Sequence, residues 1–191
     1  RYDLPAFGDV SVAVGYANAE IYDVAVKYAN TTGDLTTNIN VGYSINKDGG
    51  SNVGGTSSDL LQAQAGIMQN SSGIFGVVTY SIESADNATA GTGDDTDAFY
   101  IKGGIKKGWS DVGKTTIYAS LGLYNDQYGT GNDDGISGSE VQAFGLGVSQ
   151  DVGKRLKVYG KYETLSLDVD GTAAAKTLYA GAEDLDLITF G

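Results

Sequence analysis

Hydrophobic and polar residues alternate along most of this chain. Between Val10 and Tyr28 an apolar or aromatic residue stands at every second position, apart from a break over Ala17–Glu20. A period of two predicts β-strands that each have one apolar face. The apolar set is Val10, Val12, Val14, Tyr16, Tyr22, Val24, Val26 and Tyr28, and the opposite set is Ser11, Ala13, Gly15, Asp23, Ala25 and Lys27.

The same alternation recurs in later segments, so we predict ten strands in all. The later segments are Leu35–Ile45, Leu61–Ile67, Ile74–Ile82, Phe99–Ile105, Ile117–Leu123, Phe144–Val148, Leu156–Tyr162 and Leu185–Phe190. The last of these is cut short by the end of the sequence. The pattern predicts an all-β fold.

The connections between the predicted strands alternate between short and long. The short ones are 29–34, 69–73, 107–114 and 151–154, and the long ones are 47–58, 83–97, 125–139 and 168–182. One connection departs from this order, because Ala17–Glu20 falls on the long side and holds four residues. An up-and-down meander with its long loops on one side is the layout of outer-membrane barrels, whereas alternation alone would also fit a soluble sandwich or solenoid.

Aromatic residues at the strand ends add support for a membrane barrel. Tyr16, Tyr28, Tyr43, Tyr80, Trp109 and Tyr162 lie at or near predicted ends, where aromatic girdles meet the two membrane interfaces. Ordinary strand propensity would also place aromatic residues in strands. In a membrane barrel the apolar faces contact lipid and the polar faces line a lumen. Closure follows, because an unpaired strand edge in hydrocarbon costs several kcal/mol for each group.

Composition removes most other classes of protein. The 191 residues include 24 acidic and 12 basic side chains, a net charge of −12, with no cysteine and no histidine. Disulfides, thiol chemistry, the usual zinc sites and histidine-based triads are therefore excluded. The acidic excess disfavours nucleic acid as a partner. No apolar run approaches the length of a transmembrane helix, which needs about 18 residues.

Two motifs resemble ligand sites without meeting their requirements. Gly108–Thr115 matches the phosphate-loop pattern, but an alternating β-branched segment follows it where a phosphate loop needs a helix. The acidic loops Gly91–Asp97 and Gly129–Gly135 contain oxygen ligands for calcium but lack the EF-hand spacing, so we expect solvated turns there, with loose divalent-cation binding near lipopolysaccharide phosphates as the alternative. We predict no metal site, no cofactor and no catalytic residues, because no nucleophile with an oriented base is evident.

Several segments are similar, in order, to Gram-negative general porins. They are "RYDLPAFGDVSVAVGY" at 1–16, "YDVAVKYA" at 22–29, "KKGWSDVGKTTIYA" at 106–119, "FGLGVSQDV" at 144–152 and "VYGKYETLSLDV" at 158–169. The resemblance implies a sixteen-stranded, usually trimeric, water-filled barrel in the outer membrane, of which this chain would hold the tail of strand six and strands seven to sixteen. The constriction loop, the early strands and the terminal aromatic residue of such porins are absent from the sequence. We therefore expect one barrel domain over residues 1–191 that lacks both of its ends.

The predicted function is passive diffusion of small hydrophilic solutes and ions through this channel. The expected partners are outer-membrane lipid and lipopolysaccharide, those solutes and, at full length, two further copies in a homotrimer. The predicted pore-lining charges are Asp23, Lys27, Lys102, Lys106, Lys157, Lys161 and Glu163, an excess of three positive charges. The alternative is a non-channel outer-membrane or surface β-protein with a structural or adhesive role that uses its acidic loops.

Overall fold

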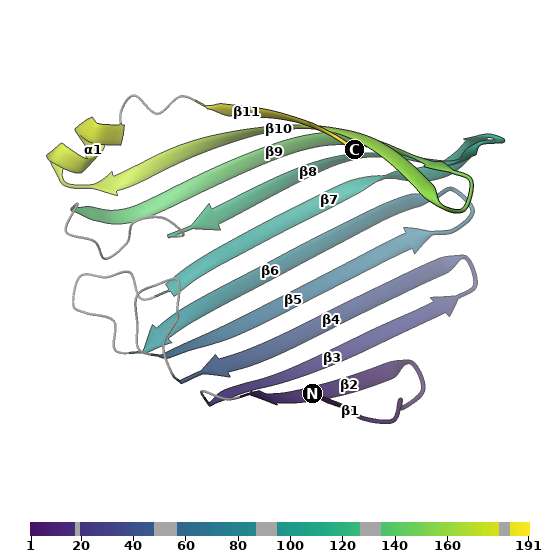
Figure 1. Cartoon of the computed structure of the whole chain (residues 1–191), viewed down its shortest axis with the longest axis horizontal. Helices are drawn as coiled ribbons and strands as arrows, with labels where there is room; N and C mark the ends of the chain where they lie inside the picture. The colour runs from purple at the N-terminus through teal and green to yellow at the C-terminus, as the bar shows by residue number, and fades with distance from the viewer. Residues whose placement is uncertain (18–19, 48–56, 87–94, 127–134, 180–183) are drawn as a thin grey trace.

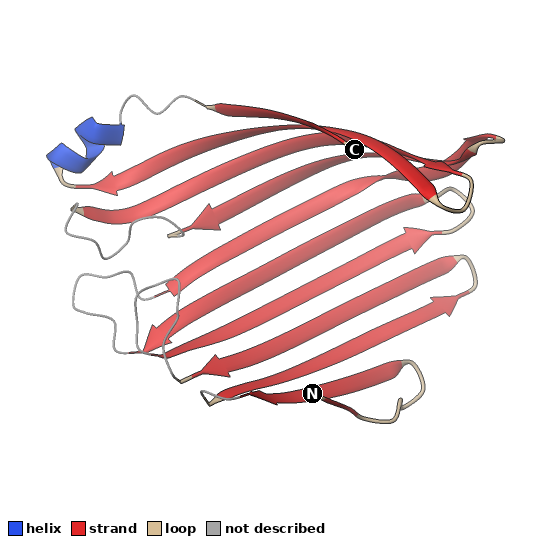
Figure 2. Ribbon diagram, in the orientation of Figure 1, coloured by secondary structure: helices blue, strands red, loops and turns tan. Residues whose placement is uncertain are grey.

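Almost all of the described chain is β-strand, as Figure 2 shows. The structure is a computed structural model, and it describes residues 1–17, 20–47, 57–86, 95–126, 135–179 and 184–191. The elements are β1 (Tyr2–Asp3), β2 (Val10–Ala17), β3 (Ile21–Thr32), β4 (Leu35–Asn46), β5 (Ser57–Gln69), β6 (Ile74–Asp86), β7 (Asp95–Ser110), β8 (Gly113–Asn125), β9 (Ile136–Val152), β10 (Leu156–Gly171), α1 (Ala173–Tyr179) and β11 (Leu185–Phe190).

The strands form one antiparallel sheet in which sequence neighbours are also spatial neighbours (Figure 1). The order runs from β1 to β11 without a crossover, so the predicted all-β, antiparallel up-and-down architecture is confirmed. Among the described residues the sheet is open, and β1 and β11 each pair with one neighbour.

The connections alternate in length as predicted. Turns of two residues, Gly33–Asp34 and Asp111–Val112, join β3 to β4 and β7 to β8, and they lie at the right-hand ends of the strands in Figure 1. The connections 47–56, 87–94 and 126–135 join strands at the opposite ends. The short Ala17–Glu20 connection remains the exception, since β2 ends at Ala17 and β3 begins at Ile21.

Three details of the predicted elements were wrong. The described residues form eleven strands instead of ten, because the two-residue β1 pairs with β2. The expected turn 107–114 is mostly strand, since β7 continues to Ser110 before β8 begins at Gly113. The expected long loop 168–182 contains the end of β10 and the helix α1, where Thr172 Oγ1 accepts a hydrogen bond of 3.3 Å from the Ala175 amide.

The register gives the sheet two faces of opposite character. One row of directly paired residues crosses ten strands and begins Val10, Tyr28, Ile39, Ala65, Val78, Ile101, Leu121, Phe144. The adjacent row on the other side begins Ser11, Lys27, Asn40, Gln64, Thr79, Tyr100. We call these the apolar face and the polar face. Side chains alternate between the faces along every strand, so each face is continuous over the sheet.

Large hydrophobic side chains lie mostly on the outside of this protein. Val24, Ile101, Leu121 and Leu146 are 37–54% exposed on the apolar face, and the Tyr16 and Tyr22 rings lie there with centroids 5.3 Å apart. A water-soluble protein rarely exposes so large a contiguous apolar surface. The apolar face therefore has the character of a surface that contacts lipid.

The hydrophobic core of the described part is small and sits at one end of the sheet. Ile136 and Val169, which are 4% and 7% exposed, pack with Ala175 of α1, and Leu167 and Tyr179 lie against them. Lys176 of the helix donates a hydrogen bond of 2.7 Å to Asp170, which raises the pKa of Lys176. The helix is thereby held against the end of β10.

Within the described ranges, no helix is both long and apolar enough to cross a membrane.

Candidate channel wall

All seven charged residues predicted from the sequence lie on the polar face. They come from three strands: Asp23 and Lys27 from β3, Lys102 and Lys106 from β7, and Lys157, Lys161 and Glu163 from β10. The structure brings five of them together, because β8 and β9 are the only strands between β7 and β10. The β3 pair lies on a separate part of the sheet.

Two contacts occur among the charged residues of β7 and β10, and they involve Lys102, Tyr118, Lys161 and Glu163. Lys161 Nζ lies 2.7 Å from Glu163 Oε1, and Lys102 Nζ lies 3.6 Å from the centroid of the Tyr118 ring. The ring attracts the ammonium group through its negative face. Among the described residues, Lys102 makes no ion pair. Its positive charge therefore stays uncompensated by a carboxylate.

Glycine on the neighbouring strand makes room for Tyr118. A Cβ atom at Gly147, its cross-strand partner, would lie 2.3 Å from the ring carbon Cζ. A Cβ atom at Gly145 would lie 2.6 Å from Ser120 Oγ. The large side chains of β8 and β10 therefore lie close to the sheet over glycine positions of β9.

Asp151 forms ion pairs with two further lysines, and the sequence pattern did not predict this role. Its carboxylate lies 3.3 Å from Lys157 Nζ and 3.9 Å from Lys106 Nζ. The sequence interpretation placed Asp151 in a turn, whereas β9 extends to Val152. We call Lys102, Lys106, Lys157 and Lys161, together with Asp151 and Glu163, the lysine cluster.

The charge balance of the polar face is less positive than predicted. Asp23 and Glu163 are not the only carboxylates that we place on the polar face. Asp151 lies there because it pairs with Lys157, and Glu83 lies there because it belongs to β6, where it pairs with Leu60 of β5. Together with the seven predicted residues, these two carboxylates reduce the predicted excess from three positive charges to one, with five lysines and four carboxylates in that set. The lysine cluster itself keeps an excess of two, with four lysines and two carboxylates.

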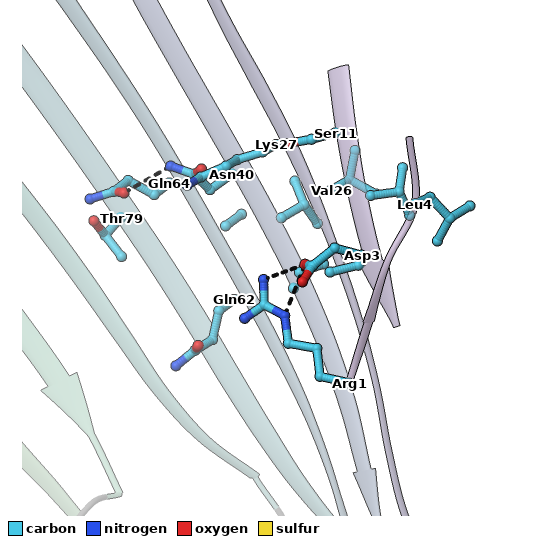
Figure 3. Close-up of a pocket in the computed structure, with 16 residues that line it drawn as sticks. Arg1, Asp3, Leu4, Ser11, Val26, Lys27, Asn40, Gln62, Gln64 and Thr79 are labelled. Atoms are coloured by element: carbon cyan, nitrogen blue, oxygen red, sulfur yellow. Dashed lines mark hydrogen bonds and ion pairs between the residues drawn. The ribbon is translucent and has the colours of Figure 1, made fainter. Parts of the chain in front are cut away.

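The polar face of β2–β6 is hollowed and almost neutral. A hollow of about 510 Å³ lies over these strands and the N-terminal segment. Figure 3 shows its polar lining residues, among them Lys27, Asn40, Gln62, Gln64 and Thr79, beside apolar ones such as Leu4 and Val26. Asn40 Nδ2 donates to Gln64 Oε1 over 3.1 Å, and Arg1 pairs with Asp3 over 3.0 Å. Amide groups of this kind present both donors and acceptors to water or to a neutral solute.

The phosphate-loop lookalike is a β-hairpin. Gly108–Thr115 runs from the end of β7 through the turn Asp111–Val112 into β8, so no helix N-terminus is present to hold a phosphate group. Gly113 has a φ of 153°, and a Cβ atom there would lie 2.2 Å from the Asp151 carbonyl oxygen. The glycine therefore serves the close approach of β8 to β9.

Replacing Lys114 by alanine should leave the affinity for ATP unchanged, because we expect no binding above background in the parent protein. A calorimetric titration with ATP and magnesium checks this for both proteins. A saturable signal that disappears in Lys114→Ala would contradict the hairpin interpretation.

The predicted solvated acidic loops lie largely outside the described residues. Residues 91–94 and 129–134 are not described, whereas Asp97 belongs to β7 and accepts a hydrogen bond of 3.2 Å from Asn125 Nδ2. Within the described part, no three histidine, cysteine, aspartate or glutamate side chains are grouped so that they could hold a metal ion.

Comparison with known protein families identifies a match over most of the chain. The sequence profile of the Gram-negative porin family matches residues 1–170. No curated protein and no solved structure matches the chain. The matched range includes β1 to β9 and nearly all of β10, and with them the whole lysine cluster.

Proposed function

The chain belongs to the Gram-negative porin family, and from this we propose that it forms the wall of a water-filled channel in the bacterial outer membrane. The channel passes small hydrophilic solutes and ions down their gradients. The polar face lines the lumen, and the apolar face contacts outer-membrane lipid and lipopolysaccharide.

The observation that carries this proposal is the separation of the two faces. Over β3 to β5, hydrophobic side chains cover one face and remain exposed, while amides and charges occupy much of the other. Lipid on one side and water on the other satisfy both surfaces at once. A soluble sandwich would instead bury the apolar face against a second layer.

In this proposal the complete pore has the strand number and the oligomeric state that are usual for general porins. Sixteen strands close the barrel, so that no strand edge faces lipid, and three copies form a homotrimer. Closure would supply partners for the outer edges of β1 and β11, which pair on one side in the described residues.

The lysine cluster gives the lumen a preference for anions in this account. Loop charges in open solvent act over a Debye length of about 8 Å at physiological salt. Charges on the wall of a narrow pore are focused by low-dielectric surroundings and screened less. The four lysines and two carboxylates of the cluster therefore outweigh the acidic loops where solutes pass.

Single-channel recording on the full-length protein tests the proposed function. In a planar bilayer with potassium chloride we expect stepwise ohmic conductance that rises in proportion to salt concentration, as in a water-filled pore. Absence of conductance from folded, inserted protein would contradict the channel and favour the structural or adhesive alternative.

A further inference from the structure

The polar face changes from charged to apolar along β10. Lys157, Lys161 and Glu163 lie on the half near the short turns, whereas Leu165, Leu167 and Val169 follow at the same spacing toward α1. Neighbouring strands continue the apolar half. The register of β9, β10 and β11 places six apolar side chains together on this face, and we call them the leucine patch. They are Val141, Ala143, Leu165, Leu167, Leu185 and Leu187.

Part of the leucine patch is accessible although it lies on the polar side of the sheet. Ala143 is buried, and Leu167 packs against the core residues Ile136 and Val169. Leu185 and Leu187 are 55% and 40% exposed, and Leu165 and Leu167 are half-buried. In the row that holds Leu165 and Leu185, the positions on β3 to β6 carry Lys27, Asn40, Gln64 and Thr79. An apolar surface on an otherwise polar wall marks a place where an apolar group can bind.

Lys102, which makes no ion pair within the described part of the chain, lies one row from the patch. Two adjacent cross-strand rows run from β7 to β11 on this face. The first row is Lys102, Ser120, Gly145, Glu163 and Leu187, and the second is Tyr100, Gly122, Ala143, Leu165 and Leu185. Adjacent rows on one face are about 7 Å apart, two residues along a strand. Lys102 on β7 and Leu165 on β10 are in addition three strand spacings of about 4.8 Å apart, so their backbones are separated by about 16 Å. The side chain of Lys102, whose Nζ lies over the Tyr118 ring of β8, crosses part of this distance, and an elongated molecule is needed to span the rest.

Aromatic rings complete the border of the patch. Tyr100 lies in the Leu165 row, and Tyr124 pairs with Val141 in the row beyond. A Cβ atom at Gly122 would lie 2.7 Å from ring carbon Cε2 of Tyr124, so this ring covers the glycine between the two tyrosines. Flat apolar groups stack or pack favourably against such rings.

We propose that Lys102 and the leucine patch form a binding site for amphipathic monoanions, namely aryl or alkyl carboxylates, within the channel. The carboxylate lies at Lys102, because Glu163 already neutralises Lys161. The hydrocarbon part lies on Leu165 and its neighbours. This site rests on the proposed channel function and adds selective binding to simple diffusion.

Current block in single channels of the full-length protein tests the site with three probes. 4-Butylbenzoate carries both features, acetate carries the charge alone, and benzyl alcohol carries the ring alone. We expect 4-butylbenzoate to block half of the current at a concentration at least about tenfold below that of either other probe, because burial of each added CH₂ group strengthens binding several-fold. Equal block by acetate and 4-butylbenzoate would overturn the proposal.

Matched variants locate the block. Leu165→Asn should weaken block by 4-butylbenzoate about fivefold or more, whereas Leu60→Asn makes the same change on the polar face of β5 and should not weaken it. Lys102→Gln should weaken block similarly, with Lys27→Gln on β3 as its control. Equal effects of each variant and its control would overturn the assignment. Block that is insensitive to all four changes would also overturn it, and this is the result expected if another segment covers the patch.

Each block is expressed relative to the variant's own open-channel current. Conductance without block means that the channel exists and the binding site does not, while absence of conductance in the parent contradicts the proposed function itself. If Leu165→Asn yields no channels, Leu185→Asn on β11 removes a leucine from the same row and takes its place.

Discussion

Val24→Arg should reduce the free energy of unfolding by about 2–4 kcal/mol, because it places a charge on the lipid-facing side of β3 near the middle of the membrane. Ala25→Arg, the next residue, should cost much less, since its side chain points to the polar face. Val24 pairs with Val14 and Tyr43, whereas Ala25 pairs with Ala13 and Gly42, so the two positions differ in face and hardly in depth.

Urea titrations of the two variants in detergent micelles or bilayers measure this difference. Both residues are exposed, so loss of core packing does not distinguish them. Equal losses of stability at the two positions would contradict the assignment of the faces.

Changing Lys102, Lys157 and Lys161 together to glutamate should reverse the charge preference of the channel toward cations. The three changes turn the cluster from an excess of two positive charges into an excess of four negative charges. Because the wall charges are screened less than charges in open solvent, this is the largest change of selectivity that the fold offers.

The reversal potential of the full-length channel in a potassium chloride gradient measures the preference before and after the changes. Glutamine at the same three positions provides a graded control, which should give an intermediate potential. A potential that does not move toward cation preference would mean that these side chains do not face the pore.

The sequence predicted the alternation of strands and faces well, because period-two patterning directly encodes which side chains share a face. The assignments of Lys102, Lys161 and Glu163 to the polar face followed from this pattern alone. Asp151 and Glu83 were missed because polar residues at strand ends look like turn residues. Continuing the alternation beyond Val148 through Ser149 would have placed Asp151 opposite Lys157.

The helix α1 and the ion pairs were beyond sequence reasoning. The segment Ala173–Tyr179 has strong helix formers behind a capping threonine, but seven residues form a stable helix only when they pack on something else. That support is Ile136 and Val169, which come from two other elements. The distances within the lysine cluster depend on the stagger of β7 to β10, which the sequence pattern does not specify.

Labelling of single cysteines along β3 tests most directly the central claim that one face of the sheet meets lipid and the other meets water. The chain has no cysteine, so Val24→Cys, Ala25→Cys, Val26→Cys and Lys27→Cys each introduce one thiol. We expect a charged, membrane-impermeant thiol reagent to label positions 25 and 27 in the membrane and to leave 24 and 26 unlabelled. Equal labelling at all four positions, or labelling at 24 and 26 alone, would contradict it.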